Sequence, residues 1–182
     1  TITGQILLNG IDISTLSDSD WRKLRGTEIS MIFQNPSAYL NPNRTVENHF
    51  KDLFRAHGES YDASRVIDML NLVHLDGGER ILQSYPFQLS GGMQQRLAIA
   101  LSLILKPTIV FADEPTSALD ILVQASVLDL LREVTQALGA TVIIVTHNIK
   151  AAARIANSIG VMNKGQLVEV GSTEEVMAFP KD

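Results

Sequence analysis

Cysteine is absent from the 182 residues of the chain. Disulfide bonds and thiolate metal sites are therefore excluded, and a reducing compartment is permitted. No uninterrupted apolar run approaches the roughly 18 residues that a helix needs to span a bilayer, and the chain does not open with the pattern of a signal peptide. The first residue is Thr1 and not Met, so we expect the chain to be a piece of a longer polypeptide or a processed one.

Positive charge is also scarce. The formal net charge is −5, and no stretch of five or more basic residues occurs. This balance argues against non-specific nucleic-acid binding as the main role. The hydrophobic fraction of 45% is typical of a globular protein that buries a real core, and the length fits one α/β domain or a core with a small subdomain.

Strand and helix patterns alternate along most of the chain, which predicts an α/β fold with a mainly parallel sheet. The first strand pattern, at 3–8, is followed by the turn Asn9-Gly10 and predicts a local antiparallel hairpin. Two amphipathic helices, from Thr45 and from near Ser60, precede the central part of the chain and resemble an inserted helical subdomain. The alternative, that they are ordinary helices covering the sheet, stays open. The remaining strand patterns lie at 28–33, 108–112, 141–145, 158–162 and 166–170, and helices are predicted at 17–25, after 92, after 120, at 148–156 and from 173.

The stretch Ser90-Gly91-Gly92 stands directly before a helix pattern. Glycines let a ligand approach the backbone, and the start of a helix offers unpaired N–H groups and the positive end of a dipole. These properties together suit phosphate oxygens. The alternative is a serine N-cap on an ordinary buried helix with Gly-Gly as a turn, and these residues alone leave both interpretations open.

Polar residues end three apolar strands that we predict to be buried. Gln34 follows the strand at 28–33, the pair Asp113-Glu114 ends the next, and His147 follows the strand at 141–145. Parallel sheets gather their sites at the carboxyl ends of their strands. In nucleotide hydrolases a first carboxylate orients Mg²⁺ and a second can accept a proton from water. Taken singly, each residue also fits a bland role: a solvated glutamine, two solvated acids, and a structural histidine.

Two further residues mark the ends of one helix. Asp120 closes a short polar loop and is expected to cap the helix that follows, and Gly139 is expected to end it. A capping role for Asp120 does not exclude a functional one.

Three segments in this order carry a family resemblance: LSGGMQQR at 89–96, IVFADEPTSALD at 109–120 and IIVTHN at 143–148. Together they resemble the nucleotide-binding domain of ABC transporters, over essentially the whole chain. The resemblance implies a P-loop NTPase-like, mainly parallel α/β sheet with a helical subdomain and a small antiparallel β part. It also implies that 1–182 is one truncated ATPase domain, in which 45–88 is approximately the helical subdomain and 89–182 the remainder of the catalytic core.

The same resemblance implies ATP and Mg²⁺ as cofactors and assigns roles to individual residues. Glu114 corresponds to the general base for the attacking water, and His147 to the switch histidine that contacts the γ-phosphate. Asp113 corresponds to the Walker B carboxylate that holds Mg²⁺, and Gln34 to the glutamine that touches both Mg²⁺ and the γ-phosphate. The residues implied to contact ATP, several of them on the nucleotide held by an opposite subunit, are Gln34, Ser90, Gly91, Gly92, Gln95 and Asp120.

A finer resemblance lies in FQNPSAYLNPNRTV at 33–46 and SYPFQLSGGMQQR at 84–96, which are similar to importer ATPases for oligopeptides, dipeptides and nickel. That resemblance implies a second ATPase subunit, identical or paralogous, two transmembrane permease subunits and, indirectly, an extracytoplasmic solute-binding protein, with no nucleic acid. It implies a peripheral location at the cytoplasmic face of the cell membrane. Met93 stands where the broad family has Gln, and Asn35 and Asn148 replace the more usual Asp.

One family motif is missing. No G-x-x-x-x-G-K-[ST] occurs in the 182 residues, although the family places this phosphate-cradling loop upstream of a stretch resembling 3–10. We therefore expect the chain alone to be inactive and, with sheet edges and apolar side chains exposed, poorly soluble. The alternative function is that of a degenerate, non-hydrolytic subunit that completes another subunit's ATP site. A DNA-maintenance ATPase is disfavoured because its long coiled coil has no room between Gln34 and Ser90.

Overall fold

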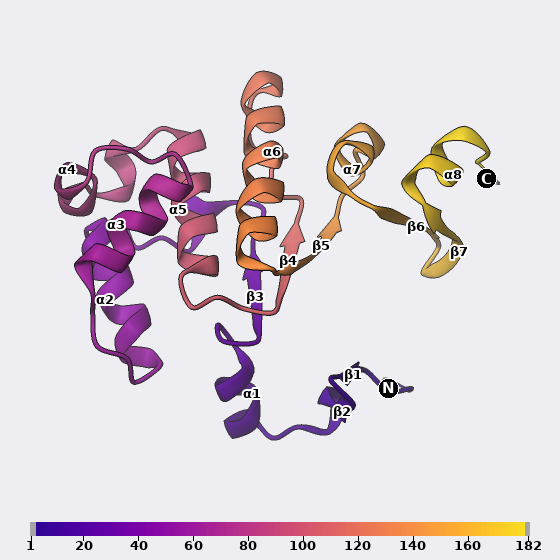
Figure 1. The fold of residues 1–182 in the computed structure, drawn as a ribbon, viewed down its shortest axis with the longest axis horizontal. Helices are drawn as coiled ribbons and strands as arrows, with labels where there is room; N and C mark the ends of the chain where they lie inside the picture. The colour runs from indigo at the N-terminus through magenta and orange to yellow at the C-terminus, as the bar shows by residue number, and fades with distance from the viewer. Residues whose placement is uncertain (1–2, 181–182) are drawn as a thin grey trace.

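The computed structural model describes residues 3–180, except for the side chain of Leu122. Figure 1 shows a central sheet with a helical region on one side and small β units at the two ends of the chain. The strands are β1 (Leu7–Leu8), β2 (Ile11–Asp12), β3 (Ile29–Ile32), β4 (Ile109–Asp113), β5 (Thr141–Val145), β6 (Ser158–Asn163) and β7 (Gln166–Ser172). The helices are α1 (Asp18–Leu24), α2 (Val46–Ala56), α3 (Ala63–Leu72), α4 (Glu79–Gln83), α5 (Gly91–Leu103), α6 (Ile121–Leu138), α7 (Ile149–Ile155) and α8 (Thr173–Ala178).

The main sheet is parallel, with the strand order β3-β4-β5. Ile32 pairs with Ala112, and Asp113 pairs with Val145, so the three strands end at the same edge. Long crossovers connect the strands, as parallel pairing requires. The α/β class with a parallel sheet and small antiparallel units, predicted from the sequence, is confirmed.

Helices cover only one face of this sheet. The core side chains of β3 and β4, Ile32 and Val110 (both 0% exposed), pack with apolar residues of α5 and α6. On the opposite face Met31, Phe111 and Ile143 stand in register and are 41%, 36% and 44% exposed. The prediction that these strands are buried is therefore wrong for one face, because in the described part of the chain no helix lies over it.

The region from 46 to 88 is helical, as predicted, and packs against α5 through an apolar interface. Phe50 and Phe54 of α2, with Val66 and Leu70 of α3, are fully buried there. The second helix begins at Ala63, three residues later than predicted, and α4 was not anticipated. The assignment of residues 45–88 as a separate subdomain stays a prediction.

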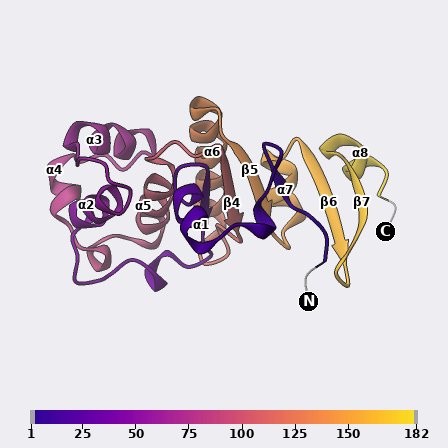
Figure 2. The same ribbon diagram turned by 90° about the horizontal axis from the view of Figure 1, so that it is seen from below.

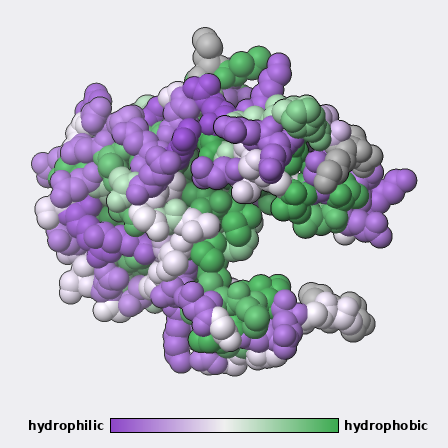
Figure 3. All heavy atoms as spheres, turned by 45° about the vertical axis from the view of Figure 1, so that its right-hand side comes forward, coloured by the Kyte–Doolittle hydropathy of each residue, from purple (hydrophilic) through white to green (hydrophobic). Residues whose placement is uncertain are grey.

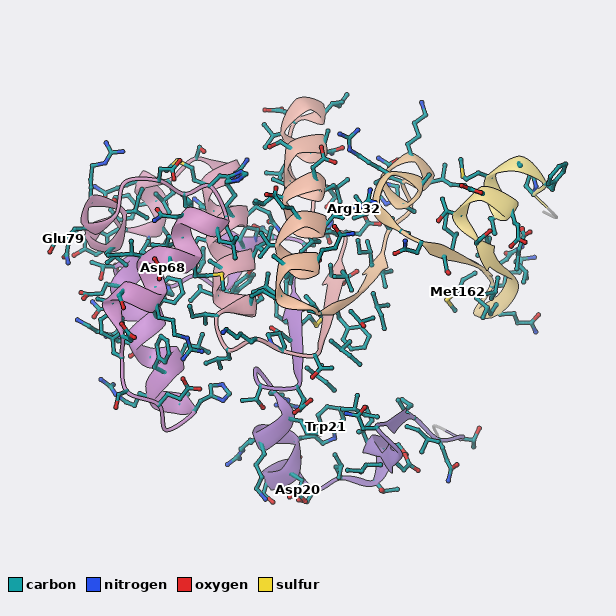
Figure 4. All side chains as sticks on the ribbon, in the orientation of Figure 1. Asp20, Trp21, Asp68, Glu79, Arg132 and Met162 are labelled. Carbon is teal, nitrogen blue, oxygen red and sulfur yellow. The ribbon has the colours of Figure 1, made fainter. Side chains whose placement is uncertain are left out.

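The two ends of the chain form smaller units. The short β1–β2 hairpin and α1, which carries Trp21, extend below the sheet, and the antiparallel β6–β7 hairpin, which carries Met162, packs with α8 (Figures 2 and 4). Both hairpins match predicted strand pairs, although β1 and β2 are shorter than expected. In Figure 3 hydrophobic side chains line the hollow between the β1–α1 arm and the body of the molecule.

None of the helices in residues 3–180 combines the length and apolar character that crossing a membrane requires.

Candidate active site at the carboxyl edge of the sheet

The strand register brings the predicted strand-end residues to one edge of the sheet. Ile32 pairs with Ala112, so Gln34 follows β3 just beyond the point where Asp113 ends β4. Asp113 in turn pairs with Val145, and His147 lies two residues farther along. Residues from three separate segments thus meet at the carboxyl edge, where parallel sheets place ligand contacts.

Glu114 is held in an unusual conformation at this edge. Its backbone has φ = +44°, a left-handed conformation that is uncommon for a residue with a side chain. Its N–H donates to the carbonyl oxygen of Val145 at 2.9 Å, which fastens the residue to the end of β5. Such strained positions cost roughly 1–3 kcal/mol and cluster at functional sites. The turn directs the carboxylate toward the loop between β5 and α7.

Three donors from that loop surround the Glu114 carboxylate. The backbone N–H of His147 donates to Oε1 at 2.8 Å, and the Nδ1 atom of its ring contacts the same oxygen at 2.5 Å. The hydroxyl of Thr146 donates to Oε2 at 3.3 Å. The Glu114 side chain is 19% exposed and the His147 side chain 82%, so the carboxylate is oriented by the loop while one side of the pair faces solvent.

The electrostatic result is an ionised carboxylate. Partial burial alone raises the pKa of Glu114, but the backbone and side-chain hydrogen bonds from His147, its charge and the Thr146 hydroxyl together outweigh burial, and the pKa lies below its ordinary value. A carboxylate of this kind, kept charged and fixed in direction, can accept a proton from a water molecule placed against it.

A small pocket of about 120 Å³ opens beside Glu114. The loop that follows β4 contributes Thr116 and Ser117, and α6 contributes Gln124. Gln124 donates through Nε2 to the carbonyl oxygen of Leu119 at 3.0 Å, which ties the start of α6 to that loop. The remaining lining residues are Thr146, His147 and Asn148. The pocket is large enough for a few water molecules beside the carboxylate.

A divalent cation at this edge would need oxygen ligands from phosphate and water in addition to those from the protein. Asp113 and Gln34 are exposed and offer oxygen atoms, the donors that Mg²⁺ prefers. Within residues 3–180 no cluster of three or more His, Cys, Asp or Glu side chains forms a metal cage. In phosphate-binding sites Mg²⁺ is commonly held by one or two protein groups together with phosphate and several waters.

The Ser90-Gly91-Gly92 stretch opens α5, and the structure confirms the N-cap, whereas phosphate binding stays a prediction. Ser90 is the N-cap and accepts from the N–H of Met93 at 3.3 Å. A Cβ atom built on Gly92 would lie 3.0 Å from Val123 Cγ1 of α6. Ser90 and Gly91 are exposed, so the first N–H groups of α5 face solvent and are available to an anion.

The structure shows the side-chain environments of two further predicted residues, Asp120 and Gln95. Asp120 occupies the N-cap position of α6, but its side chain makes no capping hydrogen bond, so the predicted side-chain cap is wrong. Gln95 is 1% exposed inside α5, with an unpaired Nε2 atom, and its contact with ATP stays a prediction. The structure adds Thr146 to the site, and the only signal for it was a hydroxyl beside His147.

Comparison with known proteins supplies a family. Residues 1–117 match the family described as ABC transporter. The chain is 43% identical over 183 residues to the dipeptide transport ATP-binding protein DppD of Caldanaerobacter subterraneus, covering 98% of this chain and 56% of that protein. It is 42% identical to DppD of Bacillus subtilis (98% and 54%) and 38% identical to the oligopeptide transport ATP-binding protein OppD of Lactococcus lactis (99% and 54%). The chain therefore spans about half the length of the curated relatives it matches.

Solved structures agree with the fold. The dimeric ATP-binding cassette MJ0796, bound to ADP and Pi in a post-hydrolysis state, is 30% identical with a TM-score of 0.78, over 94% of this chain and 74% of that one. The cbiO1 protein of Clostridium perfringens, part of the transporter complex cbiONQ, is 30% identical with a TM-score of 0.82, over 97% and 69%.

Proposed function

This chain belongs to the ABC transporter family, and from that premise we propose that it is part of an ATP-hydrolysing subunit that powers an importer. The proposed cargo is oligopeptides, dipeptides or nickel and other metal chelates. The names of relatives that are 38–43% identical support peptides within that range. The single observation that carries the hydrolytic part is the carboxylate of Glu114, which His147 and Thr146 of the β5–α7 loop hold in a fixed orientation.

In the proposed reaction each strand-end residue has one task. Glu114 accepts a proton from the attacking water, and His147 holds that carboxylate and contacts the terminal phosphate. Asp113 and Gln34 provide oxygen ligands for Mg²⁺. When bound, this ion neutralises charge on the transferred phosphoryl group.

The opening of α5 acts on a different nucleotide in this proposal. Ser90, Gly91 and Gly92, together with Asp120 at the N-cap position of α6, would contact ATP held by a second ATPase subunit. The exposed N–H groups at the start of α5 support this, because a helix N-terminus attracts phosphate oxygens. Gln95, whose side chain is buried in α5, belongs to the same proposed set of ATP contacts.

The proposed assembly contains this subunit, a second ATPase subunit, two transmembrane permease subunits and, indirectly, an extracytoplasmic solute-binding protein. We place it at the cytoplasmic face of the cell membrane as a peripheral component. Nucleic acid is not a proposed partner, since the net charge is −5.

An alternative is a non-hydrolytic subunit that completes another subunit's ATP site. Such a subunit would use the exposed residues Ser90 and Gly91 at the start of α5, because a helix N-terminus attracts phosphate oxygens. The retained base argues against it, because a subunit that only completes a site needs no oriented Glu114.

The test compares Glu114→Gln with Glu79→Gln in the full-length protein, in the presence of MgATP. Glu79 is an exposed residue of α4, on the far side of the helical region (Figure 4), and serves as the matched control. Glu114→Gln should lower turnover by about 10²-fold or more while nucleotide binding persists, because the amide cannot accept the proton. Glu79→Gln should match the wild type. Wild-type turnover in Glu114→Gln contradicts the hydrolytic proposal, and absence of turnover in the full-length wild type favours the alternative.

A further inference from the structure

One side chain at the carboxyl edge has no assigned role although it contacts the proposed base. Thr146 follows β5 directly and is partly buried. Its hydroxyl lies 3.3 Å from Glu114 Oε2, on the carboxylate oxygen that His147 does not touch. The two carboxylate oxygens are therefore held by two consecutive residues of one loop.

The direction of the Thr146 hydrogen bond follows from counting donors. A hydroxyl has one hydrogen to donate and two lone pairs to accept with. The N–H of Asn148 donates to Thr146 Oγ1 at 3.1 Å and so uses a lone pair. The single hydrogen remains for Glu114, whose ionised carboxylate can only accept.

The hydroxyl is itself fixed in position by the start of α7. Asn148 caps this helix: its Oδ1 atom accepts from the N–H groups of Lys150 and Ala151 at 3.1 and 3.2 Å. The chain of contacts therefore runs from the first turn of α7 through Asn148 and Thr146 to Glu114. If the Thr146 hydroxyl served only the local turn, accepting from the N–H of Asn148 would be enough. The additional hydrogen bond that it donates to Glu114 serves no purpose within that turn.

We propose that Thr146 is a positioning residue for Glu114, fixing the rotation of its carboxylate so that one oxygen faces the attacking water. His147 alone holds Oε1, and a carboxylate held at one oxygen can still swing about that contact. The Thr146 hydroxyl removes this freedom. The inference rests on the proposed hydrolytic function, since it assigns to Thr146 a task in that reaction.

The experiment measures steady-state ATP hydrolysis of the full-length protein carrying Thr146→Val, Thr146→Ser or Thr141→Val. Valine has nearly the shape of threonine but lacks the hydroxyl, whereas serine keeps it. Thr141 is the matched control, because it begins the same strand, is exposed and makes no side-chain hydrogen bond within residues 3–180. Thr146→Val should lower kcat about tenfold, the loss that one hydrogen bond to a charged group accounts for, with the KM for ATP and the melting temperature nearly unchanged. Thr146→Ser should recover most of kcat, and Thr141→Val should match the wild type.

Three results would overturn the proposal: wild-type kcat in Thr146→Val, equal losses in Thr146→Val and Thr146→Ser, or a change in KM alone. If Thr146→Val does not fold, Thr146→Ala removes the same hydroxyl while taking less space. Glu114→Gln is measured in parallel. If it keeps full turnover, the hydrolytic function itself fails, whereas its loss of turnover beside a fully active Thr146→Val refutes only the role of Thr146.

Discussion

His147 contacts Oε1 of Glu114 twice, through its backbone N–H at 2.8 Å and through its ring Nδ1 at 2.5 Å. The backbone contact depends only on the path of the β5–α7 loop, and the ring contact depends on the side chain. Substitution of His147 therefore removes the ring contact with Glu114 but leaves the backbone contact in place.

This division predicts the behaviour of His147 variants. His147→Ala keeps the backbone N–H but loses the ring contact, so Glu114 stays near its place with less restraint, and turnover of the full-length protein should fall by about tenfold to a hundredfold. His147→Asn is the matched variant, because its side-chain amide nitrogen can donate from about the position of Nδ1. We expect it to hydrolyse ATP faster than His147→Ala. Equal rates for the two variants would mean that the ring acts on something other than Glu114.

Substitutions at Gly92 can distinguish a role in packing α5 against α6 from a role in contacting ATP. Alanine normally stabilises a helix relative to glycine by up to about 1 kcal/mol, but a Cβ here would lie 3.0 Å from Val123 Cγ1 and push α6 away from α5. Gly92→Ala should therefore lower the melting temperature, measured by circular dichroism, and Gly92→Ala combined with Val123→Ala should restore it. Gly91→Ala, whose Cβ would lie 3.6 Å from Leu119, is the control and should melt no lower than the wild type.

A second measurement on the same double variant tests the proposed contact with ATP. If Gly92 serves only helix packing, turnover of the full-length protein returns together with stability. If the nucleotide of a second subunit also approaches this glycine, turnover stays low in a protein that is stable again. An unrestored melting temperature would show that Val123 is not the side chain that limits the space.

Local features of the fold were predictable because short-range rules govern them. Gly139 ends α6 in a left-handed conformation as predicted, β5 has the bounds that its β-branched run indicated, and Asn148 caps α7. Each feature depends on residues within one turn or one strand. The shared edge that gathers Gln34, Asp113 and His147 was also predictable, because parallel strands end on the same side.

Features that depend on distant partners could not be predicted. The hydroxyl of Thr146 meets a carboxylate 32 positions away in the sequence, and the register between β4 and β5 sets that contact. One local rule also failed: the side chain of Asp120 has the right type and position for a cap, yet it makes no capping bond. An apolar strand pattern does not tell whether helices cover one or both faces of a sheet. In the described residues, helices cover one face of the main sheet.

The pair of Asp129 and Arg154, which joins α6 to α7, predicts a pH-dependent stability. Hydrogen bonds and charge from Arg154 hold the pKa of Asp129 below its ordinary value of 3.8. Because the folded pKa is depressed, the pair stabilises the fold above the unfolded pKa, and this contribution is lost as the pH falls through the folded pKa. Asp129→Asn should therefore melt slightly below the wild type at pH 7, and the difference should shrink at an acidic pH below 3.8 as the carboxylate of the folded protein becomes protonated. Asp68→Asn, an exposed position on α3 (Figure 4), should show no difference at either pH.

The uncovered face of the main sheet predicts how the 182-residue chain behaves in solution. Ile143 is 44% exposed on this face, in register with Phe111 and Met31, whereas Val110 on the opposite face is fully buried. Contiguous exposed apolar surface favours association. Ile143→Thr removes apolar surface while keeping a β-branched residue in the strand, so it should raise the soluble fraction and lower light scattering without lowering the melting temperature.

Val110→Thr makes the same kind of change on the packed face and provides the contrast. It should destabilise the chain by roughly 1–3 kcal/mol, because the new hydroxyl is buried among the apolar side chains of α5 and α6. If Ile143→Thr destabilises the chain as much as Val110→Thr does, the Ile143 face is packed in solution. An unchanged soluble fraction in Ile143→Thr would instead assign association to another surface, such as the exposed β6–β7 hairpin, where Met162 and Val170 are 68% and 62% exposed.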